Sequence, residues 1–399
     1  MKKVILVFLA CLMVSMQSVA WAENQITAQH LTWSEASDST QTITWQMAEL
    51  NPDMVVEYQE ENSADRNKIA ASVEPFYNEI ATRYVYHVVL RDLKPNMRYA
   101  YRIGDGTVWS ETAQFKSAAG RDACEFLLFG DSQSYNYAVW GNTLQRAYQA
   151  HQNADFFVNV GDLVDNGQRL SEWENWFSQG QTIMRQLPLV PVVGNHEAYT
   201  PSREFSLPKY FTTQFVLPQN GPSDLKEQAY SFDYANVHFV VLDTQFGEER
   251  KFVPDSLAKQ LKWLEDDLAK TDKTWKIVFM HRAPYHNRAD KGFDDTIQFV
   301  PLFEQYNVDV VFTAHDHVCA RTAAMKAGQA AEGGVVYATT GRSGTKVYDT
   351  VAAKEWNIKF FNPVDEPTYS TISIHEKKIT VNVWTQRGAL IDTWSIEKK

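Results

Sequence analysis

The middle of the chain contains short apolar runs that alternate with helical stretches. The runs FLLFG, DFFVNVG, LVPVVG, KIVFM and VDVVFT are apolar at nearly every position, so both faces of each strand must be buried. Helical patterns lie between them, near residues 137–152, 171–186, 254–270 and 296–306. Strands covered on both faces form layered α/β cores. We therefore predict an α/β domain over residues 122–399.

The segment before this domain has a different pattern, in which apolar and aromatic residues alternate with polar ones. QTITWQM, YVYHVVL and RYAYRI are examples, and turn residues such as Gly-Asp-Gly at 104–106 separate them. Many short alternating strands are typical of a β-sandwich. We predict an all-β sandwich over residues 23–116 and a linker at residues 117–121.

The first 22 residues resemble a secretory signal. MKKVILVFLACLMVSMQSVAWA has two lysines, an apolar run, and small residues at Ala20 and Ala22 that suit an Ala-x-Ala cleavage site. The run is too short to span a membrane, and no later stretch is long and apolar enough. We expect a signal peptide at residues 1–22 and a periplasmic or secreted mature protein. Lipid attachment at Cys11 is an alternative, but the residues before it fit that signal poorly.

Charge and cysteine content limit the partners. The net charge is −11, and removing Lys2 and Lys3 with the signal makes it more negative. An acidic surface does not attract polyanions, so bulk nucleic-acid binding is not expected. We expect no disulfide between Cys124 and Cys319, because one opens a strand whose far end carries the site and the other follows the site.

Most of the apolar runs stop at a residue that can bind a metal. Ligands of α/β sheets bind beyond the carboxyl ends of the strands, where such residues meet. The residues are two carboxylates, one amide and three imidazoles: Asp131, Asp162, Asn195, His281, His315 and His317. Each alone is more commonly a turn or surface residue, but five strand ends with the same property indicate a metal site.

The number of candidate ligands points to two ions. A single catalytic zinc normally takes three or four protein ligands, and a central carboxylate, here Asp162, can bridge two ions. Two cations about 3.5 to 4 Å apart activate a water and hold the oxygens of an in-line displacement at phosphorus. The sequence therefore predicts a phosphohydrolase.

The motifs GDSQ, GDLVDNG, GNHE and HDHVCAR follow one another in the order found in a known family. The sequence resembles the calcineurin-like metallophosphoesterase superfamily, and most closely the purple acid phosphatases and their bacterial relatives. LKPNMRYAYRIGDGTVWS resembles their N-terminal domain. The resemblance implies a fibronectin-III-like sandwich at residues 23–116 and a layered α-β-β-α metallophosphoesterase domain at residues 122–399.

The resemblance also implies roles for single residues. It assigns one metal to Asp131, Asp162 and His317. It assigns the second metal to Asp162, Asn195, His281 and His315. His196 matches the histidine that faces the substrate and can protonate the leaving oxygen. His286 and Arg321 are candidates for substrate binding, although a surface loop and an ion pair suit them equally well.

Two positions depart from the family pattern. Asp165 stands where purple acid phosphatases have the tyrosine that gives their colour, so no purple colour is expected. Gln133 stands where many other members have a histidine. An amide oxygen or water would then complete the first metal site, and the ions could be Fe, Zn, Mn or Ca.

Three functions compete. The first is an exported hydrolase of phosphate monoesters or diesters, in which a metal-bound hydroxide attacks phosphorus of a phosphorylated small molecule. The second is a surface-binding or adhesion protein with an inactive metal domain. The third is a metallohydrolase of a non-phosphate ester. Intact GNHE and HDH motifs favour the first, while the natural substrate and the oligomeric state are open.

Overall fold

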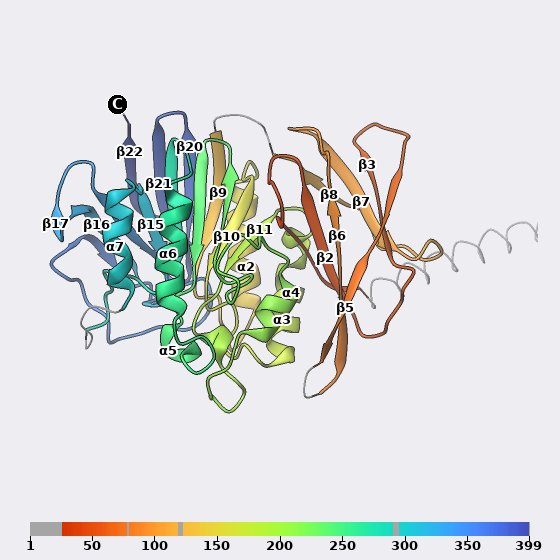
Figure 1. The fold of residues 1–399 in the computed structure, drawn as a ribbon, viewed down its shortest axis with the longest axis horizontal. Coiled ribbons are helices and arrows are strands. Elements are labelled where there is room, and N and C mark those ends of the chain that lie inside the picture. The colour runs from red at the N-terminus through yellow and green to blue at the C-terminus, as the bar shows by residue number, and fades with distance from the viewer. Residues whose placement is uncertain (1–25, 78–79, 119–122, 290–294, 399) are drawn as a thin grey trace, which may run out of the picture.

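The structure, a computed structural model, describes residues 26–77, 80–118, 123–289 and 295–398. The predicted signal peptide and residues 119–121 of the predicted linker lie outside these ranges. The described residues form two regions that follow each other along the chain, a β-sandwich and an α/β domain (Figure 1).

The N-terminal region is a sandwich of two four-stranded antiparallel sheets. One has the order β1-β2-β6-β5, with bounds Thr27–Thr32, Gln41–Met47, Thr82–Leu90 and Ser72–Tyr77. The other has the order β4-β3-β7-β8, with bounds Asn67–Ala70, Val55–Glu60, Arg98–Gly104 and Ala113–Lys116. The alternating residues point inward, and the rings of Trp45 and Tyr86 stack 5.4 Å apart in the core. The predicted sandwich is confirmed.

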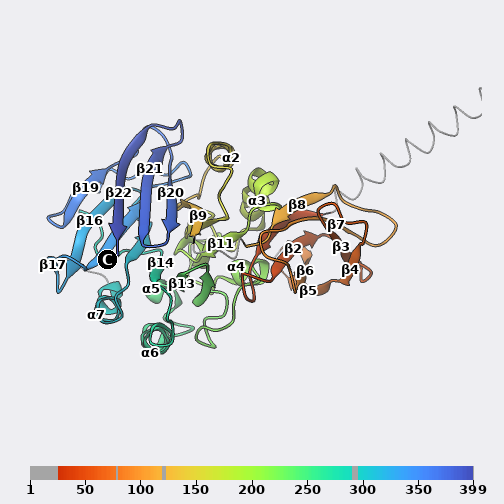
Figure 2. The same cartoon turned by 90° about the horizontal axis from the view of Figure 1, so that it is seen from above.

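The first sheet of the α/β domain has the order β11-β10-β9-β20-β21-β22. The parallel strands are β9 (Ala123–Phe129), β10 (Phe156–Val160) and β11 (Leu189–Val192). The C-terminal strands β20 (Thr368–His375), β21 (Lys378–Thr385) and β22 (Leu390–Glu397) add an antiparallel meander. Helices α2 (Ala138–Ala150) and α3 (Leu170–Met184) lie on its outer side (Figure 2).

The second sheet has the order β12-β13-β14-β15-β18-β16-β17, and β19 pairs with β16. Its strands are β12 (Tyr230–Tyr234), β13 (Val237–Leu242), β14 (Trp275–Met280), β15 (Val310–Thr313), β16 (Cys319–Lys326), β17 (Gln329–Ala330), β18 (Val335–Thr340) and β19 (Asn357–Phe361). Helices α5 (Phe246–Glu249), α6 (Ser256–Leu268) and α7 (Val300–Gln305) lie on the other side from α2 and α3 (Figure 2). The layered α-β-β-α architecture is confirmed.

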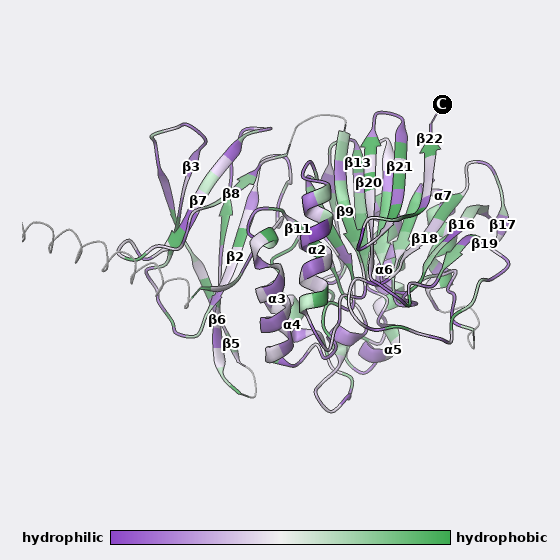
Figure 3. Cartoon of the chain, turned by 180° about the vertical axis from the view of Figure 1, so that it is seen from behind, coloured by the Kyte–Doolittle hydropathy of each residue, from purple (hydrophilic) through white to green (hydrophobic). Residues whose placement is uncertain are grey.

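The core lies between the two sheets. The ring of Phe126 on β9 stacks on Phe156 at 4.9 Å and meets Phe239 and Phe279 of the opposite sheet edge-on at 5.7 and 6.0 Å. Figure 3 shows hydrophobic residues along these strands and hydrophilic residues on α2 and α3. The strands are apolar on both faces because one face meets the other sheet and the other meets helices.

The sandwich packs directly on the α/β domain. The Trp33 ring lies 5.6 Å from Phe156 and 5.5 Å from Tyr234, and the three side chains belong to one buried cluster. The Tyr101 hydroxyl donates a hydrogen bond to the carbonyl of Arg185 at 2.8 Å. Aromatic packing and buried hydrogen bonds thus fix the sandwich against the domain that carries the site.

Cys124 and Cys319, the cysteines of the described ranges, are both buried, and no disulfide joins them there. Among the described residues, no helix has the length and apolar character needed to cross a membrane.

Candidate metal centre

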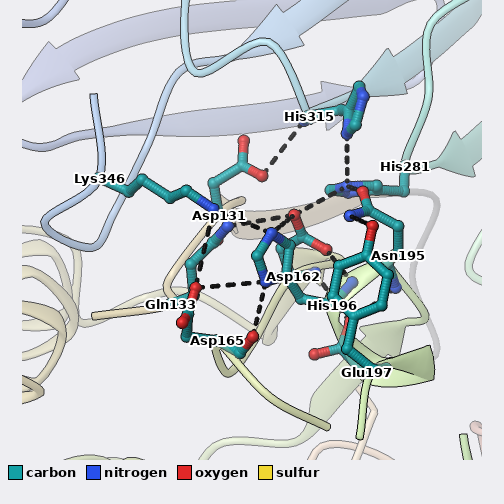
Figure 4. Close-up of polar contacts among 12 residues, drawn as sticks. Asp131, Gln133, Asp162, Asp165, Asn195, His196, Glu197, His281, His315 and Lys346 are labelled. Atoms are coloured by element: carbon teal, nitrogen blue, oxygen red, sulfur yellow. Dashed lines mark hydrogen bonds and ion pairs between the residues drawn. The ribbon is translucent and has the colours of Figure 1, made fainter. Parts of the chain in front are cut away.

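The predicted ligands meet where five strands end. Three of these strands, β9, β10 and β11, belong to the first sheet, and β14 and β15 belong to the second. Loops directly after them carry Asp131, Asp162, Asn195, His281, His315 and His317. Figure 4 shows side chains from these loops turned toward one another. The structure brings all six predicted ligands into one cluster.

The ligand loops have an unusual backbone conformation. Asp131, Asp162, His315 and His317 all have positive φ, at 50°, 53°, 68° and 57°. Residues other than glycine adopt this region at a cost of order 1 kcal/mol or more, and such strain concentrates at functional sites. The strained turns aim the side chains back over the strand ends.

Two glycines allow the ligand loops to approach closely. A Cβ at Gly161, whose φ is +85°, would lie 2.5 Å from Nδ1 of His281. A Cβ at Gly194 would lie 2.2 Å from the backbone nitrogen of Asp162. Only glycine fits either position, which gives a physical reason for the Gly-Asp and Gly-Asn pairs of the motifs.

One half of the centre collects ligand atoms from Asn195, His281 and His315 around Asp162. Nδ1 of His281 donates to the carbonyl of Val160 at 2.8 Å, which leaves Nε2 facing the centre. Nε2 lies 3.2 Å from Oδ2 of Asp162, 3.2 Å from Oδ1 of Asn195 and 3.2 Å from Nδ1 of His315. Four ligand atoms therefore converge; we call this group the His281 half.

The other half contains Asp131 and His317 beside Asp162. Nδ1 of His317 donates to the carbonyl of Lys346 at 2.7 Å, so Nε2 faces the centre, 3.4 Å from Oδ1 of Asp131. Within the described residues, Nε2 of His317 and Oδ2 of Asp131 are buried without a hydrogen-bond partner. The same holds for Oε1 of Gln133, whose Nε2 lies 3.1 Å from Oδ2 of Asp162. We call this group the His317 half.

These atoms suit two metal ions. Ligand atoms of Asp162, His281 and His315 lie within 4.8 Å of one another, and so do those of Asp131, Asp162 and His317. Asp162 belongs to both groups, as a bridge must. Buried acceptor atoms without partners cost free energy, and a cation removes that cost. The donor set of carboxylates, imidazoles and an amide oxygen fits the ions that the resemblance implies.

The charges of the centre favour an ionised Asp162 and a protonated His281. Burial raises the pKa of Asp162, but His281 and His196 outweigh it and hold that pKa well below its usual range. Burial lowers the pKa of His281, but Asp162 and Asp131 outweigh it and raise the pKa to about 9. A metal must therefore displace a proton from His281 at neutral pH.

A carboxylate that the sequence analysis missed connects two ligand loops. The fully buried Glu197 accepts hydrogen bonds from the amides of Asp162, Leu163 and Gly194 at 2.9, 2.8 and 2.7 Å. These bonds position the candidate bridge relative to Asn195. In the sequence, the glutamate of the GNHE motif was the signal that could have identified Glu197.

His196 lies at the rim of the centre and points toward it. Its Nδ1 donates to the carbonyl of Asp165 at 2.7 Å, and its Nε2 is 3.8 Å from Oδ2 of Asp162. Burial lowers the pKa of His196, but the carboxylates of Asp162 and Asp165 outweigh it and raise that pKa. Next to Nε2, at 2.9 Å, lies Nζ of Lys346, a second residue that the sequence analysis did not name.

The structure shows the surroundings of the two candidates for substrate binding. The guanidinium of Arg321 pairs with Asp392, with Nε 3.0 Å from Oδ2, and stacks over Trp394. Of the two roles open to Arg321, the structure thus shows the ion pair. His286 is buried in the loop after β14. The amide of the next residue, Asn287, donates a hydrogen bond to Oδ2 of Asp316, which lies between the candidate ligands His315 and His317.

Comparison with known families agrees with this geometry. Residues 125–319 match the model of the calcineurin-like phosphoesterases, and residues 26–117 match that of the purple acid phosphatase N-terminal domain. The chain therefore contains a calcineurin-like phosphoesterase domain. It also contains a domain that matches the N-terminal domain of the purple acid phosphatases, and this domain precedes the metal-dependent phosphoesterase domain.

Individual relatives are purple acid phosphatases. The chain is 28% identical over 309 residues to purple acid phosphatase 21 of Arabidopsis thaliana, which covers 75% of this chain and 67% of the relative. It is 29% identical over 289 residues to a purple acid phosphatase of Glycine max, covering 67% and 59%. The chain thus spans about two thirds or less of the length of these relatives.

The fold has a match among solved structures. A purple acid phosphatase from yellow lupin (Lupinus luteus) seeds superposes with a TM-score of 0.80 at 18% identity, over 94% of this chain and 74% of that one. The phosphoesterase therefore shares both the sandwich and the layered domain with that protein.

Proposed function

We propose that this phosphoesterase is an exported hydrolase of phosphate monoesters or diesters that uses two metal ions. The observation that carries the proposal is the pair of overlapping ligand groups that share Asp162. Buried, unpartnered acceptor atoms on Asp131 and His317 support it, as do the purple acid phosphatases among the relatives. Phosphoryl chemistry is the reaction in which two neighbouring ions are most useful.

Each half of the centre holds one ion in this proposal. Asp131 and His317, with Asp162, hold the first. Asn195, His281 and His315, with Asp162, hold the second. Ions bound to these residues would supply Lewis acidity toward a phosphoryl oxygen and would lower the pKa of a water at neutral pH. Fe, Zn and Mn are compatible with the mixed oxygen and imidazole donors, whereas Ca prefers oxygen ligands alone.

The side chain of His196 faces the substrate and acts as the general acid. Its Nδ1 hydrogen bond to Asp165 at 2.7 Å fixes the ring, so Nε2 is the nitrogen that can protonate the leaving oxygen. The raised pKa of His196, which Asp162 and Asp165 produce against the effect of burial, favours the protonated ring that this role requires.

Export follows from the sequence of residues 1–22, which we propose is a cleaved signal peptide, so that the mature protein is periplasmic or secreted. N-terminal sequencing of the protein from its host should give Glu23 as the first residue. Retention of the segment, or an acylated Cys11, would contradict this. We likewise propose domain limits at residues 23–116 and 122–399 with a linker at residues 117–121.

The function is tested by metal analysis combined with a substrate panel. The purified protein should contain two ions per chain and release phosphate or an alcohol from phosphate monoesters, diesters or anhydrides. Chelation should abolish turnover, and added metal should restore it. Two bound ions without turnover of any phosphate ester would favour a binding protein. Turnover of carboxylic esters alone would favour the non-phosphate hydrolase.

A further inference from the structure

A lysine lies beside the candidate metal ligands. Lys346 belongs to the loop between β18 and β19, and its Nζ is 2.9 Å from Nε2 of His196 and 3.7 Å from Oδ1 of Asp165. Nε2 of His196 is in turn 3.8 Å from Oδ2 of Asp162. Figure 4 shows the lysine side chain reaching across toward these residues. Its ammonium group therefore lies at the edge of the centre, on the side of His196.

Backbone hydrogen bonds hold the lysine loop in place. The amides of Ser343 and Gly344 donate to the carbonyls of Gly130 and Asp131 at 2.8 and 3.0 Å. The carbonyl of Lys346 accepts the Nδ1 hydrogen bond of His317 at 2.7 Å. The main chain of Lys346 thus orients a candidate metal ligand, while its side chain presents a positive charge. An ammonium group fixed in this way loses little freedom when it binds an anion.

Two cationic side chains lie close to the carboxylate of Asp165, on the His196 side of the centre. The carboxylate pairs with Arg203, and it lies 3.7 Å from Nζ of Lys346. Arg203 also approaches Nδ1 of His196, at 3.4 Å. One carboxylate therefore faces two cationic side chains, which leaves net positive charge beside the metal ligands. In the sequence, Asp165 is notable as the position of a missing tyrosine. In the structure, its carboxylate contacts Arg203 and Lys346.

The hydrogen-bonding chemistry of the pair indicates an anion. A lysine ammonium has donors and no acceptor, and the same is true of a histidine ring that is protonated for the proposed general-acid role. A phosphoryl oxygen beside both groups can accept a charge-assisted hydrogen bond from each of them. Two donors then converge on one phosphoryl group next to Asp162.

We propose that Lys346 binds the phosphoryl group of the substrate, and that Asp165, which is itself paired with Arg203, holds its ammonium in position. The inference rests on the proposed phosphohydrolase function. A phosphate monoester has three terminal oxygens and two negative charges, whereas a diester has two terminal oxygens and one charge. A fixed ammonium beside the metal ligands therefore contributes more to a monoester than to a diester with the same leaving group.

The experiment compares Lys346→Ala, Lys346→Arg and the wild type, each loaded with metal. Lys377→Ala is the matched control, because it removes one exposed lysine charge far from the centre. Three quantities are measured: metal content, the Kd of inorganic phosphate by calorimetry, and kcat/KM for 4-nitrophenyl phosphate and its methyl diester. Lys346→Ala should keep both ions, since the hydrogen bond to His317 is made by the backbone carbonyl, which the substitution retains.

In Lys346→Ala the phosphate Kd should rise about 10- to 100-fold, the loss expected for one charged hydrogen bond. The monoester kcat/KM should fall about 100-fold and the diester kcat/KM less than fivefold. Lys346→Arg should recover part of both losses, and Lys377→Ala should match the wild type. Equal losses for both esters, an unchanged phosphate Kd, or loss of an ion would each overturn the proposal. A wild type that hydrolyses neither ester refutes the proposed function, and the phosphate titration then decides the role of Lys346 alone.

Discussion

The His281 half of the metal centre gathers Asn195, His281 and His315 around Asp162, whereas the His317 half brings Asp131 and His317 to Asp162. In the His281 half, Nε2 of His281 lies 3.2 Å from three other ligand atoms. In the His317 half, Asp131 and His317 approach to 3.4 Å, and buried atoms of both lack partners within the described residues. The His281 half thus has more candidate ligands than the His317 half.

The backbone does not separate the halves in the same way. Asp131 and His317 have positive φ, at 50° and 57°, and so does His315 of the His281 half at 68°, whereas Asn195 has a helical φ of −69°. Gln133 is the side chain placed to complete the His317 half, 3.1 Å from Asp162. Two ions in one centre need not bind equally well. We expect the ion of the His317 half to bind with the lower affinity.

The largest effect is expected where the halves meet. Asp162→Asn keeps the shape of the candidate bridge but removes its charge, so both ions should bind weakly and the rate should fall at least about 10³-fold. Metal analysis and steady-state kinetics measure this, with circular dichroism to check the fold. Loss of a single ion would show that Asp162 serves one half only.

Variants of Asn195 and His196 should distinguish metal binding in the His281 half from action on the substrate. His196→Ala should lower the rate by about 10² to 10⁴, the usual contribution of a positioned acid, and keep both ions. The loss should shrink for leaving groups that need no proton, such as nitrophenolate. Asn195→Ala should instead release the ion of the His281 half, and added metal should restore part of the rate. If His196→Ala strips an ion, the general-acid role is wrong.

Acidity should weaken the His281 half. Asp162 and Asp131 outweigh burial and raise the pKa of metal-free His281 to about 9, so a proton competes with the ion at every lower pH. The affinity of this half should rise about tenfold per pH unit from neutrality to pH 9 and then level off. Titration against a competing chelator at several pH values measures it. A flat profile between pH 7 and pH 9 would contradict the assignment of His281.

A substitution at Gln133 should make the halves more alike. Gln133→His places an imidazole beside Asp162, and the affinity of the His317 half should rise about tenfold, the low end of the effects that ligand-orienting groups have. Gln133→Ala is the matched control and should not raise the affinity. A lower affinity in both variants would mean that the amide oxygen of Gln133 is itself a ligand.

The smallest expected effect concerns the colour of the protein when it contains iron. Asp165 replaces the tyrosine of the purple enzymes, so iron-reconstituted protein should show no charge-transfer band in the visible spectrum. The Tyr199 hydroxyl is 3.2 Å from Nδ2 of Asn195, which makes it the tyrosine to examine if a band appears. Loss of such a band in Tyr199→Phe would assign the ligand to the His281 half.

Much of this protein could be read from its sequence alone. Apolar runs predicted the buried strands, and alternation predicted the sandwich, because each pattern reports how many faces of a strand are buried. The six candidate ligands followed from the same reading, since the carboxyl ends of parallel strands meet at one edge of a sheet. Strands β16 and β19 were not predicted as strands, because their stretches of sequence show neither pattern clearly.

The surroundings of the ligands were decided by tertiary structure. Lys346 lies 150 positions from His196 in sequence, and Arg321 lies 71 positions from Asp392. No local pattern encodes such pairs, because they depend on how one loop or strand packs against another. Glu197 is a similar case, since its bonds to Asp162 and Leu163 depend on two ligand loops lying side by side. The sequence determined which residues reach the edge of the sheets, and packing decided which of their neighbours can act on a substrate.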